Sequence, residues 1–287
     1  MTNPVVLPAL APSPAQRIAL RIEYDGCAFG GWQKQASADI PTVQGVLEPA
    51  IAQVADAQVK LVCAGRTDSG VHATCQFVHF DLAAKRPPRA WTAGVNSLLP
   101  STVRVVEVFP VNNQFSARFS AIFRRYVYLV HESAIDSPQL AGRAARVAGE
   151  LDVAAMSAAS KHLRGERDFS SFQAAGCQSA SPNRNVLFLA VQRQRGFIVF
   201  DICANAFLQH MVRNIVGTLL EVGGGGRHPD SIRQVLQARD RKAAGKTAPA
   251  AGLYLVSVGY PPNSGIPPRT IPPPLLDDLP ATQSLVS

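Results

Sequence analysis

Cys63-Ala64-Gly65-Arg66-Thr67-Asp68-Ser69-Gly70-Val71-His72-Ala73 is the stretch around which the fold of this chain is organised. A largely apolar run, residues 59–63, precedes it, and a second run, residues 75–80, follows it. Two such runs around a glycine-bounded polar segment predict a strand, a tight loop and another strand. Flanking strands would hold the Asp68 carboxylate in one place, as a nucleophile or a general base requires.

The Asp68 carboxylate also has a purely structural interpretation. An Asp in a glycine-bounded loop often accepts backbone N–H bonds from its own turn. The segment Gly65–Gly70 alone is compatible with either role, so the rest of the chain has to decide between them.

Upstream of this stretch the pattern predicts one strand, a glycine-rich loop and one helix. Residues 17–25 alternate between apolar and charged side chains, which is typical of a half-buried strand. Residues 29–33 form a glycine-rich segment with aromatic side chains. Thr42 is placed to cap a helix whose apolar stripe extends to residue 54, with Pro49 inside it.

Downstream, residues 122–131 alternate strongly and predict a strand that carries Arg124, Arg125, Tyr126 and Tyr128. Basic groups beside aromatic rings suit contact with RNA phosphates and stacked bases. A solvated basic face with tyrosines in the core explains the same pattern, and both interpretations stay open. The basic turn at residues 85–89 has the same two interpretations.

Arg213 is an isolated charge in an otherwise apolar helical pattern at residues 207–220. A buried guanidinium is costly unless it is paired, so Arg213 predicts an acidic partner from elsewhere in the chain. A final strand is predicted at residues 251–258.

The composition favours a basic globular protein. In 287 residues, Lys and Arg exceed Asp and Glu by eight, an excess that suits a polyanionic partner and is also compatible with an ordinary basic protein. The five cysteines lack metal-ligand spacing, so we expect reduced thiols and no metal. The uncharged N-terminal segment lacks the basic start of a signal peptide, and no apolar window spans a membrane, so we expect a cytoplasmic protein.

Four regions are predicted along the chain. Residues 1–16 and the proline-rich residues 261–287 are expected to be disordered tails. Residues 17–112 and 113–260 each mix strands with helices and are predicted to be two half-domains, with the proposed nucleophile in the first.

Four separated blocks of this sequence resemble the TruA family of tRNA pseudouridine synthases. They are residues 24–33, 63–73, 118–128, and 205–217 together with 252–254. The resemblance covers about residues 17–260. It implies an α+β fold of two similar α/β half-domains whose antiparallel sheets join into one central sheet flanked by helices, with the active-site cleft between the halves.

The resemblance also implies a reaction and its residues. Uridine would become pseudouridine at nucleotides 38, 39 and 40 of the anticodon stem-loop of tRNA, after base flipping, without a cofactor, on a homodimer. Asp68 would be the nucleophile and Arg213 its ion-pair partner. Substrate contacts would come from five further residues: Tyr126 at the flipped base, Leu253 in the pocket wall, Arg66 in flipping, and Arg86 and Arg118 at phosphates.

Some features depart from the family pattern or remain open. Ser69 replaces a small apolar residue of many relatives, and Ala134 stands where some have a tRNA-contacting Arg. We interpret His72, His79 and His210 as structural histidines. An aspartyl phosphotransferase would need a second acid and Mg²⁺ near Asp68. An inactive RNA-binding protein would not need Asp68 and Arg213 together.

Overall fold

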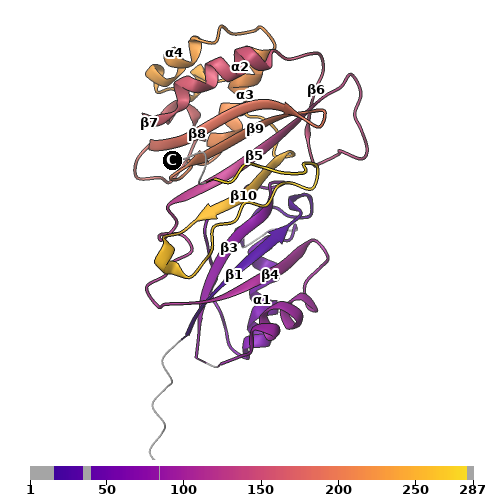
Figure 1. The fold of residues 1–287 in the computed structure, drawn as a ribbon, viewed down its shortest axis with the longest axis vertical. Helices are drawn as coiled ribbons and strands as arrows, with labels where there is room; N and C mark the ends of the chain where they lie inside the picture. Colours follow the sequence, from indigo (N-terminus) through magenta and orange to yellow (C-terminus); the bar gives the residue numbers. More distant parts are fainter. Residues whose placement is uncertain (1–15, 35–39, 84, 283–287) are drawn as a thin grey trace, which may run out of the picture.

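The structure is a computed structural model and describes residues 16–34, 40–83 and 85–282. Its centre is one ten-stranded sheet that runs through the molecule in the order β4-β1-β3-β10-β5-β9-β8-β7 (Figure 1). Two short strands lie off this path, β2 beside β3 and β6 beside β5. The strands are β1 Gln16–Tyr24, β2 Val62–Cys63, β3 His72–Leu82, β4 Val103–Val111, β5 Phe123–Glu132, β6 Ala145–Val147, β7 Gly165–Asp168, β8 Asn183–Gln194, β9 Phe197–Ala204 and β10 Leu253–Gly259.

The last strand, β10, joins the two parts of the sheet. It pairs in parallel with β3 and antiparallel with β5. Strands β1, β3 and β4 come from before residue 112, and β5, β7, β8 and β9 come from after it. The predicted α+β fold with one joined central sheet is therefore confirmed, while the division of the chain at residue 112 stays a prediction.

Helices cover one face of the sheet. They are α1 Val43–Ala55, α2 Val153–Ser160, α3 Met211–Gly223 and α4 Ser231–Ala238, with short 3-10 turns and a π-helical turn at Ala90–Gly94. Leu47 of α1, Met156 of α2 and Ile215 of α3 lie in one core cluster with that face. None of the described helices has the length and apolar character that a membrane crossing needs.

Local rules explain where the main elements begin and end. Thr42 caps α1 as predicted, because its Oγ1 accepts the N–H of Gly45 at 3.2 Å. The helix continues through Pro49 to Ala55. Strands β8 and β9 form a hairpin that turns at Arg195 and Gly196, whose φ values of 50° and 79° suit a two-residue turn.

The predicted helix at residues 207–220 begins later than its apolar pattern indicates. His210 has a φ of 61°, which a right-handed helix cannot include, so α3 starts at Met211. Phe207 and Leu208 therefore precede the helix.

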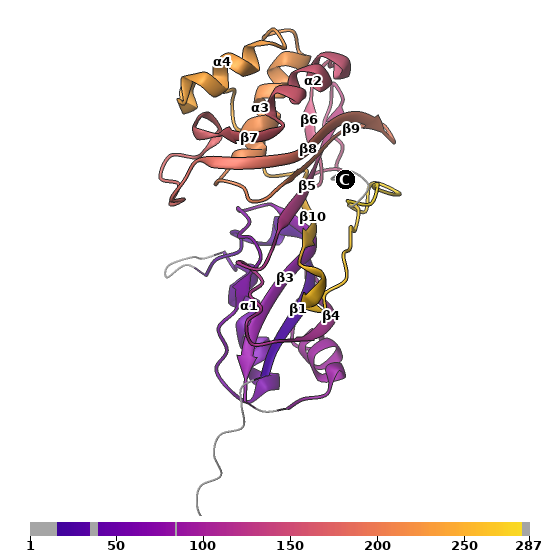
Figure 2. The ribbon, with the colours of Figure 1, turned by 60° about the vertical axis from the view of Figure 1, so that its left-hand side comes forward.

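The C-terminal segment, residues 261–282, differs from the predicted disordered tail. Figure 2 shows it on the side of the sheet opposite α2, α3 and α4. Leu276 and Leu279 are buried there, and the Ile271 N–H donates to the Val256 carbonyl at 3.0 Å. The high proline content led to the wrong prediction of disorder. An extended segment without a regular ladder of backbone hydrogen bonds can still bury leucines on an apolar sheet face. Residues 1–15 and 283–287 of the predicted tails lie outside the described residues.

This segment also explains why β1 is more buried than a half-exposed strand. Arg21, predicted on the solvated face, is 6% exposed and donates to Glu107 at 2.7 Å. Arg269 of the C-terminal segment binds the same carboxylate at 2.9 Å. Of the cysteines, Cys63, Cys75 and Cys203 are buried thiols, while Cys27 is exposed.

Candidate active site

The loop between β2 and β3 carries Asp68 and is held by the glycine-rich segment that follows β1. The Trp32 N–H donates to the Thr67 carbonyl at 3.0 Å, and the Tyr24 hydroxyl lies 2.8 Å from Thr67 Oγ1. Gly31, with a φ of 98°, leaves room for this contact, because a Cβ there would lie 3.0 Å from the Thr67 carbonyl oxygen. The two segments predicted as separate loops thus form one scaffold beneath Asp68.

The Asp68 side chain faces the N-terminal end of α3. Its Oδ2 lies 3.2 Å from Arg213 Nη1 and 3.4 Å from His210 Nε2. The structure therefore brings together Asp68 and Arg213, 145 residues apart in the chain. The acidic partner predicted for Arg213 is Asp68.

Backbone contacts fix the Arg213 guanidinium. Its Nε donates to the Ala248 carbonyl at 2.8 Å, and the Ala248 N–H donates to the Arg213 carbonyl at 3.1 Å. Gly217 permits this packing, because a Cβ there would lie 1.8 Å from the carbonyl oxygen of Lys246. Only 16% of the Arg213 side chain is exposed, so the guanidinium has little freedom to leave Asp68.

Tyr126 and Leu253 lie on neighbouring strands and on the helix-covered face. β5 and β10 pair so that Tyr126 is opposite Leu255 and Leu253 is opposite Tyr128. The Tyr126 hydroxyl lies over the loop, 3.5 Å from the position that a Cβ on Gly65 would take. Burial raises the pKa of Tyr126 well above its usual value, so the hydroxyl stays protonated.

Phe207 was not predicted as a site residue. Its ring meets that of Tyr126 edge to face at 5.2 Å, and it belongs to the segment just before α3. The apolar pattern placed it inside the helix, so the sequence carried no signal for this contact.

The sequence left contact with RNA phosphates and a solvated basic face both open for the β5 arginines, and the structure shows both guanidinium groups bound within the protein instead. Arg125 is fully buried on the opposite face, where it forms an ion pair with Asp201. Arg124 donates to backbone carbonyls, among them those of Ala64 at 2.8 Å and Asn205 at 3.0 Å. Both guanidinium groups are committed to the fold, and Arg124 links the Asp68 loop to the segment before α3.

The three arginines assigned to substrate contacts are all exposed. Arg66 belongs to the Asp68 loop, and the Arg118 guanidinium lies 5.2 Å from the centre of the Phe119 ring. Arg86 donates to the Val54 carbonyl at 3.1 Å, beside the end of α1. Their exposure leaves them available to a polyanion.

The three histidines near the motifs differ from one another. His72 and His79 are buried, and each accepts a backbone N–H at Nδ1, from Gly26 at 3.1 Å and from Ala117 at 3.0 Å. His210 is about one-third exposed and its ring faces Asp68. Because its left-handed backbone places it outside α3, the helical spacing to Arg213 gave no signal for this contact.

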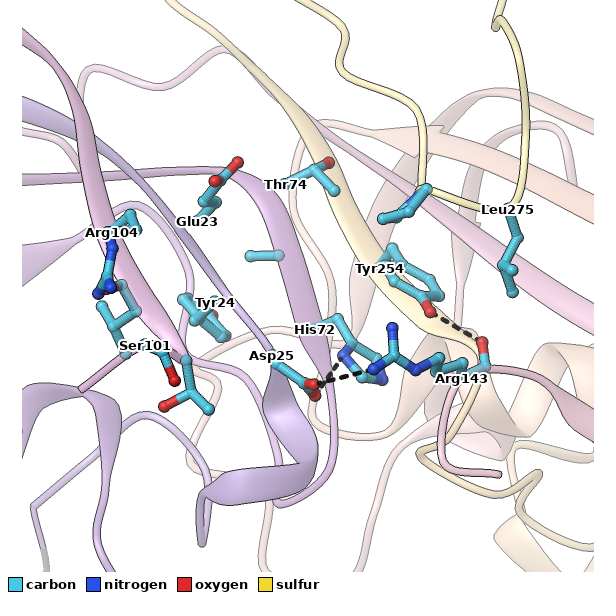
Figure 3. Close-up of a pocket in the computed structure, with 14 residues that line it drawn as sticks. Glu23, Tyr24, Asp25, His72, Thr74, Ser101, Arg104, Arg143, Tyr254 and Leu275 are labelled. Carbon is cyan, nitrogen blue, oxygen red and sulfur yellow. Dashed lines mark hydrogen bonds and ion pairs between the residues drawn. The ribbon is translucent and has the colours of Figure 1, made fainter. Parts of the chain in front are cut away.

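A second site-like feature lies on the other face of the sheet. It is a pocket of about 220 Å³. Figure 3 shows the Asp25 carboxylate beside His72 and Arg143, the second of which is its ion-pair partner, and the Tyr254 hydroxyl, which donates to the Arg143 carbonyl. Asp25, Cys27 and His72 are close enough to share a metal ion. Both ring nitrogens of His72 already have backbone partners, at Gly26 and Gly142, so we assign this cluster a structural role.

The comparisons with known proteins agree with one another. A family model described as tRNA pseudouridine synthase matches residues 21–120 and 159–261. The chain is 50% identical over 250 residues to tRNA pseudouridine synthase A of Hydrogenovibrio crunogenus, covering 87% of this chain and 95% of that protein. The proteins of the same name from Vibrio campbellii and Shewanella amazonensis are each 49% identical over 262 residues, covering 91% of this chain and 98% and 100% of theirs. A chain of a Cbf5-Nop10-Gar1 crystal structure has a TM-score of 0.32 at 12% identity, over 71% of this chain and 45% of that one, too weak a similarity to carry an argument.

Proposed function

Since this chain belongs to the family of tRNA pseudouridine synthases, isomerases that convert uridine in tRNA to pseudouridine, we propose that it acts on nucleotides 38, 39 and 40 of the anticodon stem-loop with Asp68 as its nucleophile. The observation that carries this proposal is the contact of Asp68 with Arg213 across the two parts of the molecule. An inactive RNA-binding protein would have no need of this pair.

The charge of Arg213 suits a carboxylate that reacts as an anion, because a guanidinium is always charged in proteins. Asp68 is 29% exposed, so a substrate can reach it without unfolding the loop. Rigid contacts on both sides keep the carboxylate in one orientation, which lowers the entropic part of the barrier.

The reaction is an isomerisation, and its bonds balance within the substrate. Asp68 attacks C1′ of the ribose, the C1′–N1 bond breaks, and its electron pair leaves with the uracil. After the uracil turns, C5 attacks C1′ and displaces the carboxylate. The proton on C5 is then lost while N1 gains one, so the chemistry requires no external oxidant or group donor.

The neighbouring apolar groups suit a flipped base. Tyr126 offers a ring face and a protonated hydroxyl, and Leu253 offers an aliphatic wall. The exposed Arg66, two residues before Asp68, would fill the gap that the flipped nucleotide leaves. Arg86 and Arg118 would bind phosphates, which fix the register of the RNA rather than its sequence.

We further propose that the enzyme is cytoplasmic and works as a homodimer with the tRNA lying across both subunits. The family resemblance supports the dimer, and the net charge of +8 supports an extended contact with phosphates. Light scattering of the protein with and without tRNA tests this part.

Tritium release from tRNA labelled at C5 of uridine tests the chemistry. Asp68→Asn and Asp68→Ala are expected to abolish release while tRNA binding persists. Asp277→Asn, which removes an exposed acid from the C-terminal segment, is the matched control and should behave as wild type. Turnover by Asp68→Ala at the wild-type rate would overturn the assignment.

Anticodon stem-loops with a single uridine at nucleotide 38, 39 or 40 test the proposed positions. Release from each of these substrates, and none from a stem-loop whose only uridine is elsewhere, is the expected result. Equal tritium release from every stem-loop would show that the enzyme does not select nucleotides 38, 39 and 40.

A further inference from the structure

His210 contacts the same oxygen of Asp68 as Arg213 does. Arg213 Nη1 and His210 Nε2 lie 3.2 Å and 3.4 Å from Oδ2. Within the described part of the chain, no partner is recorded for Oδ1. Arg213 and His210 therefore make the two carboxylate oxygens of Asp68 different. The protein contacts Oδ2, whereas Oδ1 is open.

The backbone of His210 is unusual for the start of a helix. Its φ of 61° and ψ of 2° lie in the left-handed region, which a residue with a side chain rarely adopts. The other described residues with this feature, glycine aside, follow a helix or lie in a hairpin turn, where the conformation is common: Asp56, Arg195 and Arg239.

The side chain of His210 also does not cap the helix that it precedes. Ser, Thr, Asp and Asn are preferred at this position because their side chains accept the free N–H groups of the first turn. His210 makes no such bond, and its ring contacts Asp68 instead. Local rules that are broken in a folded protein tend to mark functional sites.

We propose that His210 is a positioning residue for the nucleophile. Its ring, with Nε2 3.4 Å from Oδ2 of Asp68, packs against that oxygen and, with Arg213, fixes the rotation of the carboxylate so that Oδ1 faces C1′ of the bound uridine. This inference rests on the proposed role of Asp68.

Three described groups define the electrostatic setting of the ring. Asp68 faces it from the β2–β3 loop, and Arg213 shares its oxygen from α3. Tyr126 on β5 interacts with the Asp68 charge and remains protonated because burial raises its pKa. The His210 side chain is 31% exposed.

Substitutions at residue 210 separate this role from a structural one. His210→Gly suits the left-handed backbone and removes the ring, so its Tm should equal or exceed that of wild type. Its kcat should fall about tenfold, as expected when a contact that orients the nucleophile is lost, with KM for tRNA little changed. His210→Gln keeps a polar side chain of similar reach and should recover most of this loss.

His228→Gln, in which an exposed histidine near α4 is replaced, is the matched control and should keep the wild-type kcat and KM. Tm measured on the same preparations separates a loss of kcat from a loss of folding.

Two results would overturn the inference. One is His210→Gly with wild-type kcat, and the other is His210→Gln with no more activity than His210→Gly. If His210→Gly does not fold, His210→Ala takes its place in both comparisons. Failure of the proposed function is distinct, because it would appear as turnover by Asp68→Ala, whatever the behaviour of the His210 variants.

Discussion

Arg124 of β5 holds the carbonyl oxygen of Ala64 with two of its nitrogens, Nε at 3.2 Å and Nη2 at 2.8 Å. Ala64 begins the loop that carries Asp68. The Nη1 of the same guanidinium donates to Asn205, at the start of the segment that leads to Arg213. One side chain thus ties together the two segments whose contact makes the site.

Replacing Arg124 should therefore lower activity more than stability. Arg124→Lys keeps the charge but cannot reach several carbonyls at once, and a misplacement of about 1 Å at a reacting group costs on the order of 100-fold in rate. We expect kcat to fall by 10- to 100-fold, roughly, with a modest drop in Tm. Tritium release and thermal unfolding of the same preparations measure both. Arg146→Lys, at an exposed ion pair with Asp136, is the control. A lower Tm with an unchanged kcat would show that the contacts of Arg124 are only structural.

Gly217→Ala should displace the Arg213 side chain indirectly, since the substitution leaves Arg213 itself unchanged. The added Cβ would lie 1.8 Å from the Lys246 carbonyl oxygen, so the segment that also holds Ala248 must move away from α3. Overpacking of this kind costs about 1–3 kcal/mol of unfolding free energy. The Arg213 Nε contact should weaken with it, so kcat should fall as well. Urea unfolding and turnover give the two values.

Gly94→Ala is the control for Gly217→Ala, because its Cβ would meet only Val54 side-chain atoms at ordinary distances. It should leave both quantities close to wild type. Equal behaviour of the two alanine variants would contradict the role assigned to Gly217.

Removal of residues 268–287 should destabilise the protein. The segment buries Leu276 and Leu279, each worth about 1.5–3 kcal/mol on full burial. It also supplies the Pro280 carbonyl that accepts from Arg125 Nη1 at 2.7 Å. The truncated chain should unfold at a markedly lower temperature and expose an apolar sheet face to dye binding. A Tm within a degree or two of full length would show that the segment contributes little.

Acidification should destabilise the fold through His79. Burial lowers the pKa of this ring, and the nearby charge of Arg17 lowers it further. The unfolded chain therefore binds the proton more tightly than the folded chain does. Stability is complete above the unfolded value near 6.5 and falls as the pH drops from there toward the lower folded pKa.

Denaturant unfolding between pH 8 and pH 5 measures this loss. His79→Gln should flatten the dependence by at most about 1.4 kcal/mol per pH unit. His228→Gln, at an exposed site, should leave the slope unchanged. If His79→Gln kept the wild-type dependence of the unfolding free energy on pH, a group other than His79 would be responsible for it.

Much of the fold was predictable because its signals are local. Alternation gave β1 and β5, Thr42 gave the start of α1, and the apolar stripe gave α3. The C-terminal segment was mispredicted because its fate depends on a sheet face formed by distant residues. The role of the β5 arginines stayed open for a similar reason, since alternation shows that a side chain changes face but not what covers each face.

By itself the sequence determined that Asp68 lies in a fixed loop between strands and that Arg213 must find an acid, because both follow from glycine conformation, strand propensity and the cost of an unpaired buried charge. Only the tertiary structure decided that these two groups meet, that His210 joins them on one oxygen, and that Arg124 holds their segments together. Such contacts join residues up to 145 positions apart, and their geometry is set by sheet register and backbone carbonyls, which no local pattern encodes.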